Sequence, residues 1–370
     1  MAAADGKTGR GRVAVVMPTW LGDAVMATPT LRAVRERFPD ARIEAWCVKN
    51  LRPMLRPMPW IDRVRLYDKR GGGLRRAATR MRRARYDTAL VLPNSWRSAW
   101  LVWRGGARRR VGYAREGRGW MLTDRLTPPR EADGRWAMVP TLRYYLGAAG
   151  LLGAATDDAA MGLFVSDGQR RSAERVMRAA GLSFEPIAEG RRRLRPIVLL
   201  NPGAQNPAKR WPAERFARVA DVLTRDADAQ VAVTGSPAER AVLDAVVESA
   251  HAPVADLASH GLTLGALKGV VAAADLMITN DTGPRHLAAA LNTPAVTLFG
   301  PTDPGWTTID APAERLIVAP DAIDATPAER RRFVSAPRRM GDIAVSKVVM
   351  AAAELLAETG VSSPPEGSLG

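Results

Sequence analysis

The chain has 370 residues, 46% of them hydrophobic, which is enough for two globular domains with buried cores. It carries 54 Lys and Arg against 38 Asp and Glu, a formal net charge of +16. This excess indicates a polyanionic binding partner: nucleic acid, an anionic membrane surface or an acidic substrate. One cysteine, Cys47, and three widely separated histidines exclude a disulfide framework and argue against a protein metal site.

The chain shows no targeting or membrane-spanning segment. Residues 1–12 lack the apolar core of a signal peptide, and no stretch approaches the ~18 consecutive apolar residues of a membrane span. We therefore expect a cytoplasmic protein, whose membrane contact would be peripheral and on the cytoplasmic side.

Short apolar runs alternate with amphipathic segments along the chain. Buried strands are predicted at 13–17, 43–48, 88–92, 197–200, 230–234, 276–279 and 295–299, and helices between them at 31–38, 213–224, 238–250 and 264–274. This alternation predicts an α/β fold of parallel sheets covered by helices. We place an N-terminal domain at 1–184, a linker at 185–196, a C-terminal domain at 197–344, a last helix at 345–358 and a disordered tail at 359–370.

Loops at the carboxyl ends of parallel strands are where ligands bind in such sheets. The first of them reads Pro18-Thr-Trp-Leu-Gly-Asp23, and Asp23 stands at the start of the next helix. As an N-cap it would stabilise that helix by ~1 kcal/mol, and as a general base its carboxylate would take the proton of an acceptor hydroxyl. The spacing leaves both roles open.

The most informative motif runs from 276 to 286, Leu-Met-Ile-Thr-Asn-Asp-Thr-Gly-Pro-Arg-His. A buried strand ends in a polar break, and Pro284 suits the first position of a following helix. A junction of this kind points free backbone N–H groups and the positive end of a helix dipole at one spot. The motif therefore predicts a phosphate site in the C-terminal half.

Two more loops follow strands of the C-terminal half. In the loop 201–212, Gly203 allows close approach of the backbone to a ligand, Lys209 and Arg210 add positive charge, and Trp211 is predicted to be structural. With the motif at 281–284, this loop makes a plausible diphosphate clamp. In the loop 234–239, Glu239 suits either the hydroxyls of a ribose or the dipole of the next helix.

Basic residues crowd the segment 69–118, where Trp96, Trp100, Trp103 and, just beyond it, Trp120 are interleaved. Most of these cations are expected to lie on a solvated face. The functional interpretation that fits best is a surface for anionic lipid head groups, with tryptophan at the lipid interface. Nucleic acid lacks any recognition motif here, and we expect none as a partner.

Four segments, Pro18–Asp23, 92–96 (Leu-Pro-Asn-Ser-Trp), 203–212 and 281–286, occur in order and at suitable separations. In them the chain resembles the ADP-heptose:lipopolysaccharide heptosyltransferase family, heptosyltransferase II in particular, from about residue 13 to about residue 349. The resemblance implies the GT-B fold, with two Rossmann-like, doubly wound domains facing a central cleft. It also implies an inverting, metal-independent glycosyltransferase, with the acceptor on the N-terminal domain and the nucleotide-sugar on the C-terminal one.

The resemblance also implies roles for single residues. Asp23 would be the catalytic base, and Asn94 and Ser95 would face the acceptor. Donor-binding residues would be Gly203, Lys209, Glu239, Asp281, Thr282, Gly283 and His286, with Lys209 on the phosphates and Asp281 near the sugar. The implied partners are a nucleotide-sugar, ADP-heptose by the resemblance, and an anionic glycolipid at the inner membrane surface, without a cofactor; we expect a monomer.

Two alternatives stay open at this point. The first is a transferase that uses another nucleotide-sugar for a cell-envelope glycolipid. The second is an inactive protein that binds nucleotides or anionic surfaces. Replacement of Asp23 separates an enzyme from a binding protein, because only the enzyme depends on a base.

Overall fold

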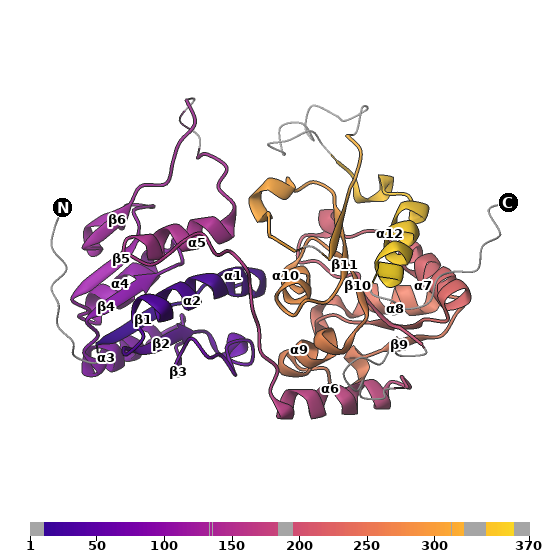
Figure 1. The fold of residues 1–370 in the computed structure, drawn as a ribbon, viewed down its shortest axis with the longest axis horizontal. Helices are drawn as coiled ribbons and strands as arrows, with labels where there is room; N and C mark the ends of the chain where they lie inside the picture. Colours follow the sequence, from indigo (N-terminus) through magenta and orange to yellow (C-terminus); the bar gives the residue numbers. More distant parts are fainter. Residues whose placement is uncertain are drawn as a thin grey trace. The chain divides into compact units, whose positions relative to one another are not determined.

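The computed structural model describes residues 11–132, 134, 136–183, 195–311, 313–321 and 338–358. These residues form two compact units, each with its own parallel sheet (Figure 1). The first unit comprises the described residues up to Phe164 together with Gly305–Asp310, and the second comprises Val165–Pro304 and the described residues from Ala311 onward.

The first unit contains a six-stranded parallel sheet in the order β3-β2-β1-β4-β5-β6. Its strands are β1 (Arg12–Val16), β2 (Arg42–Cys47), β3 (Arg63–Leu66), β4 (Thr88–Val91), β5 (Arg109–Tyr113) and β6 (Asp124–Leu126). Its helices are α1 (Leu21–Met26), α2 (Thr28–Arg37), α3 (Gly73–Ala84), α4 (Trp96–Arg104) and α5 (Thr141–Gly150), with short 3-10 turns η1 (Lys49–Leu51) and η2 (Gly119–Met121). The strand order reverses between β1 and β4, so the loops after these two strands flank the switch point where ligands bind.

Helices cover this sheet because its central strands are apolar along their whole length. Every residue of β4 is buried, and so are four of the five residues of β1. α3 and α4 pack side by side over one face, where Ala77 and Met81 of α3 join Ala14 and Val16 in a common core. α5 packs against α1 and α2.

The second unit repeats the design with the order β12-β11-β10-β7-β8-β9, again with parallel pairs. Its strands are β7 (Ile197–Asn201), β8 (Gln230–Val233), β9 (Val254–Asp256), β10 (Leu276–Asn280), β11 (Ala295–Phe299) and β12 (Glu314–Val318). Its helices are α6 (Asp167–Ala179), α7 (Ala213–Ala227), α8 (Arg240–Ser249), α9 (Leu264–Ala273), α10 (Gly283–Ala290) and α12 (Val345–Glu358). The 3-10 turns of the second half are η3 (Pro207–Lys209), η4 (Pro237–Glu239), η5 (Ala258–His260), η6 (Pro304–Thr307) and η7 (Met340–Asp342). The switch point lies between β7 and β10.

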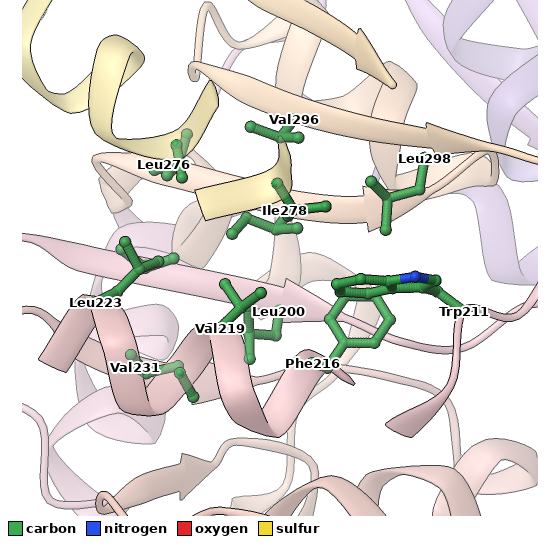
Figure 2. Packing of buried hydrophobic residues seen from close by; sticks show 14 of the residues in the cluster. Leu200, Trp211, Phe216, Val219, Leu223, Val231, Leu276, Ile278, Val296 and Leu298 are labelled. Atoms are coloured by element: carbon green, nitrogen blue, oxygen red, sulfur yellow. The ribbon is translucent and has the colours of Figure 1, made fainter. Parts of the chain in front are cut away.

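The core of the second unit fixes the loop that follows β7. Figure 2 shows Trp211 and Phe216 beside the side chains of Leu200, Ile278 and Leu298 from the three central strands. The rings of Trp211 and Phe216 meet edge to face at 5.0 Å, and the Trp211 indole N–H donates to the carbonyl of Ile343 at 3.1 Å. Trp211 is therefore structural, as predicted.

The sequence analysis identifies the central strands and the α/β class correctly, and the two parallel sheets confirm the predicted fold. It misses the internal strand β5, which begins with two arginines, and the edge strands β3, β6, β9 and β12, which are only partly buried. It is wrong about α6, which packs against α9 of the second unit rather than with the N-terminal domain. Most of the predicted linker, 184–194, and the predicted tail, 359–370, lie outside the described residues.

Candidate functional site

Asp23 lies in the first turn of α1, directly after the switch-point strand β1. The N-cap of α1 is Trp20, and Asp23 makes no side-chain cap hydrogen bond, so the N-cap role considered for Asp23 is wrong. Pro29 stands in the first turn of α2, so it begins a second helix rather than kinking a continuous one. Burial raises the pKa of Asp23 from its ordinary value of 3.8 to about 6. A carboxylate with that pKa is ionised at neutral pH and is a stronger base than a solvated one.

The Asp23 side chain lines a cavity of about 270 Å³ within the first unit. Polar groups come from Asp23, Asn94 and Arg115, and the walls are largely aromatic. The aromatic side chains are Trp136, Tyr144, Tyr145 and Trp306. Aromatic faces stack on the C–H faces of sugars while carboxylate and amide groups fix the hydroxyls, so the lining suits a carbohydrate.

A buried arginine positions Asn94 in this cavity. The guanidinium of Arg118 donates to the carbonyls of Pro93, Ser95 and Tyr113 and, at 3.3 Å, to Asn94 Oδ1. Burial lowers the pKa of Arg118 to about 10, and its hydrogen-bond partners among the described residues are neutral oxygens.

Tyr144 supports Asn94 from the other side. Its hydroxyl donates to Asn94 Oδ1 at 3.0 Å, and its ring stacks on Tyr113 with centroids 3.6 Å apart. With Oδ1 engaged by Tyr144 and Arg118, the amide N–H groups of Asn94 are oriented for a ligand oxygen. Ser95, predicted beside Asn94 for the acceptor, is the N-cap of α4, where its hydroxyl accepts from the Ser98 N–H, and its predicted contact with the acceptor stays a prediction.

A chain of ion pairs organises the second site, at the carboxyl ends of β7 and β10. Lys209 Nζ lies 2.7 Å from Asp281 Oδ2, and Arg285 reaches Asp281 Oδ1 at 3.7 Å. Arg285 also binds Glu314 in a bidentate pair, at 2.6 and 3.0 Å. Asp281 is 5% exposed and the Lys209 side chain 28% exposed, so the ammonium is held at the rim by a buried carboxylate.

The start of α10 presents backbone donors beside Lys209. In the described part of the chain, the N–H groups of Thr282 and Gly283 donate to no protein acceptor. Pro284, in the first turn, has no N–H to satisfy. Two unsatisfied donors, the positive end of a helix and an ammonium together suit an anion, which is the ligand that the sequence predicts for these residues.

His286 lies one turn further along α10 and is buried, with 3% of its surface exposed. Burial, helped by the charges of Arg285 and Lys209, lowers its pKa from 6.5 to about 3, so the ring is neutral at physiological pH. Its Nδ1 has no hydrogen-bond partner among the described residues. An unpartnered buried nitrogen is costly, so His286 Nδ1 is free to bind a ligand or a water, and its predicted donor contact stays a prediction.

Glu239 and Gly203 bring the other two loops together. A Cβ placed on Gly203 would lie 2.2 Å from Glu239 Oε1, so any larger residue would have to displace this carboxylate. Glu239 Oε2 accepts from the Ser236 N–H and hydroxyl, at 2.8 and 2.7 Å, in a capping box. Glu239 therefore caps its turn with one oxygen and keeps the other beside the Gly203 backbone, which leaves its predicted ribose contact geometrically open.

Buried amides tie the loops together and were missed by the sequence analysis. Asn280 accepts from the Trp211 N–H at 3.2 Å and donates to the Pro202 carbonyl at 2.8 Å. Asn201 donates to Thr279 and, at 3.4 Å, to Thr282 Oγ1. Their position at strand ends is the only signal in the sequence, because their partners lie some 70 to 80 residues away.

The described residues contain neither a cluster of metal ligands nor a membrane-spanning helix. No group of three or more His, Cys, Asp or Glu side chains is arranged to hold a metal ion. No helix in the described ranges is long and apolar enough to cross a bilayer.

Comparison with known proteins gives consistent results. Residues 74–331 match the family model for glycosyltransferase family 9 (heptosyltransferase). The chain is 32% identical over 317 residues to lipopolysaccharide heptosyltransferase 2 of Escherichia coli K12, covering 80% of this chain and 84% of that protein.

Solved structures agree on the architecture. The structure of E. coli ADP-heptose lps heptosyltransferase II superposes with a TM-score of 0.76 at 26% identity, covering 94% of this chain and 99% of the other. A family 9 glycosyltransferase from Veillonella parvula DSM 2008 gives a TM-score of 0.78 at 24% identity, covering 94% and 97%, and supports the fold alone.

Proposed function

Because the chain belongs to glycosyltransferase family 9, the heptosyltransferases, we propose that it moves a heptose from ADP-heptose to the inner core of lipopolysaccharide. The observation that carries the proposal is the pair of sites at the two switch points. In the first unit a half-buried carboxylate lines a cavity suited to a sugar, and in the second an ammonium and free N–H groups at a helix start suit a diphosphate.

Asp23 is the proposed base for the acceptor. Its carboxylate takes the proton of a heptose hydroxyl as that oxygen forms a bond to the anomeric carbon of the donor. The bond from the anomeric carbon to the diphosphate oxygen breaks, and its electron pair leaves with ADP. Attack from the face opposite the leaving group inverts the anomeric configuration, through a transition state of oxocarbenium character.

The second unit is proposed to stabilise the leaving ADP. Lys209 and the N–H groups of Thr282 and Gly283 supply positive charge where the diphosphate becomes more negative. Each such preorganised donor contributes ~3 kcal/mol to lowering a barrier in comparable sites. These groups take the place of a metal ion as the counter-charge, which is why we propose a metal-independent reaction.

Donor binding is also proposed to rearrange the Lys209–Asp281 pair. A diphosphate brought to Lys209 competes with Asp281 for the ammonium, which stands 2.7 Å from that carboxylate. Asp281 keeps its second cation, Arg285, at 3.7 Å, and so is not left uncompensated when Lys209 turns to phosphate. The freed carboxylate oxygen is then available to a hydroxyl of the donor sugar.

Calorimetric titration with ADP, UDP, GDP and TDP, without added metal and with EDTA present, tests the donor assignment. We expect ADP to bind at least tenfold more tightly than the other three nucleotides. Preference for another nucleotide would keep the transferase but discard ADP-heptose. Binding of none by the folded protein would leave an inactive surface-binding protein.

A further inference from the structure

The outer face of the first unit formed by α3, α4 and η2 is strongly basic. Arg75, Arg76, Arg82 and Arg83 of α3 are exposed, and so is Arg104 of α4. Neither helix contains an acidic residue, and none of these five guanidinium groups forms an ion pair with a carboxylate in the described residues. By contrast, two arginines of β5 in the same unit (Figure 1) have structural partners: Arg109 binds the Asp124 carboxylate, and Arg110 donates to the Met121 carbonyl.

Exposed tryptophans lie on the same face. Trp96 and Trp103 of α4 are 45% and 40% exposed, and Trp120 of η2 is 58% exposed. The rings of Trp103 and Trp120 meet edge to face at 5.3 Å and form one projecting aromatic pair. Tryptophan placed among cations is the residue favoured at the boundary between lipid head groups and acyl chains.

A groove between α3 and α4 joins the two kinds of residue. Its volume is about 560 Å³, and Arg75, Thr79 and Arg82 of α3 line it together with Trp100 and Arg104 of α4. Guanidinium groups that converge on an open groove suit the phosphate of a lipid head group, because the fork of N–H donors matches phosphate geometry.

We propose that this face, Arg75 to Arg83 of α3 with Trp103, Arg104 and Trp120, binds the surface of an anionic phospholipid bilayer. Charge complementarity indicates an anionic lipid surface as the binding partner, because the face is cationic and its neighbouring aromatic rings are exposed. The aromatic pair is arranged edge to face rather than as a parallel platform for successive bases, which favours lipid over single-stranded nucleic acid.

The position of the face explains what docking achieves. α4 begins at Trp96, two residues after Asn94, which lines the cavity containing Asp23. A bilayer held against α3 and α4 would keep the first unit, which contains this cavity, at the membrane surface where a membrane-anchored acceptor is found. This consequence rests on the proposed function, whereas lipid binding itself does not.

Sedimentation with vesicles tests the proposal on the full-length protein. The vesicles contain phosphatidylcholine alone or phosphatidylcholine mixed with phosphatidylglycerol. We expect binding only to the anionic vesicles, and weaker binding as salt rises toward the point where the Debye length is ~3 Å. Equal binding to both vesicle types, or no binding to either, would overturn the proposal.

Charge reversal on two helices provides a matched comparison. Arg75→Glu/Arg82→Glu on α3 should lower the partition coefficient by about 30-fold, the effect of two lost head-group contacts. Arg171→Glu/Arg175→Glu on α6 changes the net charge equally on exposed positions of the other unit and should lower it less than about threefold. An equal loss in both variants would show that net charge, and not this face, drives binding.

A second pair of variants separates insertion from attraction. Trp103→Ala/Trp120→Ala should remove the part of the vesicle binding that survives high salt. Met350→Ala should leave this part unchanged, because Met350 is a 61% exposed apolar residue on α12, outside the proposed face. ADP affinity should be unchanged in every variant, which also shows that each is folded. If transfer to a soluble acceptor fails in the unaltered protein while vesicle binding holds, the proposed function is wrong and the docking face remains.

Discussion

Replacing Asp23 with asparagine should abolish transfer and at the same time stabilise the protein. Asparagine keeps the shape of the side chain but cannot take a proton. Loss of a general base lowers turnover by ~10²–10⁴-fold, while ADP, whose proposed site is in the second unit, should keep its affinity. In the unaltered protein, log kcat/KM should fall by one for each pH unit below about 6, the raised pKa of this carboxyl.

The gain in stability follows from the raised pKa. Burial moves the pKa of Asp23 from 3.8 to about 6, so the folded state binds the proton more tightly than the unfolded state does. The free energy of unfolding therefore falls as pH rises through this window. The ionised carboxylate costs about 3 kcal/mol at pH 7.5 and about 1.5 kcal/mol at pH 5, at 1.36 kcal/mol per pKa unit. Asp23→Asn should recover up to these amounts.

Urea unfolding followed by tryptophan fluorescence measures this effect in the relevant unit, because nine of the ten tryptophans belong to the first unit and only Trp211 to the second. The difference between the variant and the unaltered protein should be larger at pH 7.5 than at pH 5. If the two proteins show equal stability at both pH values, Asp23 is not a buried, destabilised carboxylate. If the variant retains full turnover, Asp23 is not the base.

The remaining predictions concern the groups around the two sites. Lys209→Ala should weaken ADP binding by about 10- to 100-fold, the value of a charge-assisted hydrogen bond, and an unchanged calorimetric affinity would remove it from the clamp. Gly203→Ala should weaken donor binding, because the added Cβ meets the Glu239 side chain. In a Glu239→Ala background the same change should lower donor affinity less. Additive losses of affinity in this double-mutant cycle would show that the two residues do not interact. In Arg118→Lys, the lysine cannot bind the backbone carbonyls and Asn94 at the same time, so the KM for the acceptor should rise about tenfold and the affinity for ADP should stay unchanged. A change in the affinity for ADP alone would contradict the role of Arg118 in the first unit.

The central strands were predictable because apolar runs such as β10 and β11 are buried on both faces and have no other explanation. The edge strand β3, Arg-Val-Arg-Leu, has no such signal, since its pairing with β2 determines its structure. α6 looks like any amphipathic helix, and only its contact with α9 assigns it to the second unit.

The sites divide in the same way. Asp23 and the 281–286 segment follow strands directly, so chain position alone places them at the carboxyl edge of a sheet. Tyr144 and Trp306 line the cavity that contains Asp23, and Arg118 holds Asn94 from behind it, through contacts between distant residues that no local pattern encodes. Ser95 has a structural role that the sequence analysis did not assign: its hydroxyl caps α4, and its predicted contact with the acceptor stays a prediction.

The most direct measurement is a transfer assay with ADP-heptose, a heptose-bearing inner-core acceptor and EDTA, in which the product is analysed by NMR. The account predicts stoichiometric release of ADP and a single new glycosidic bond whose anomeric configuration is opposite to that of the donor. Retention of configuration, a requirement for added metal, or transfer only from a different nucleotide-sugar would contradict it.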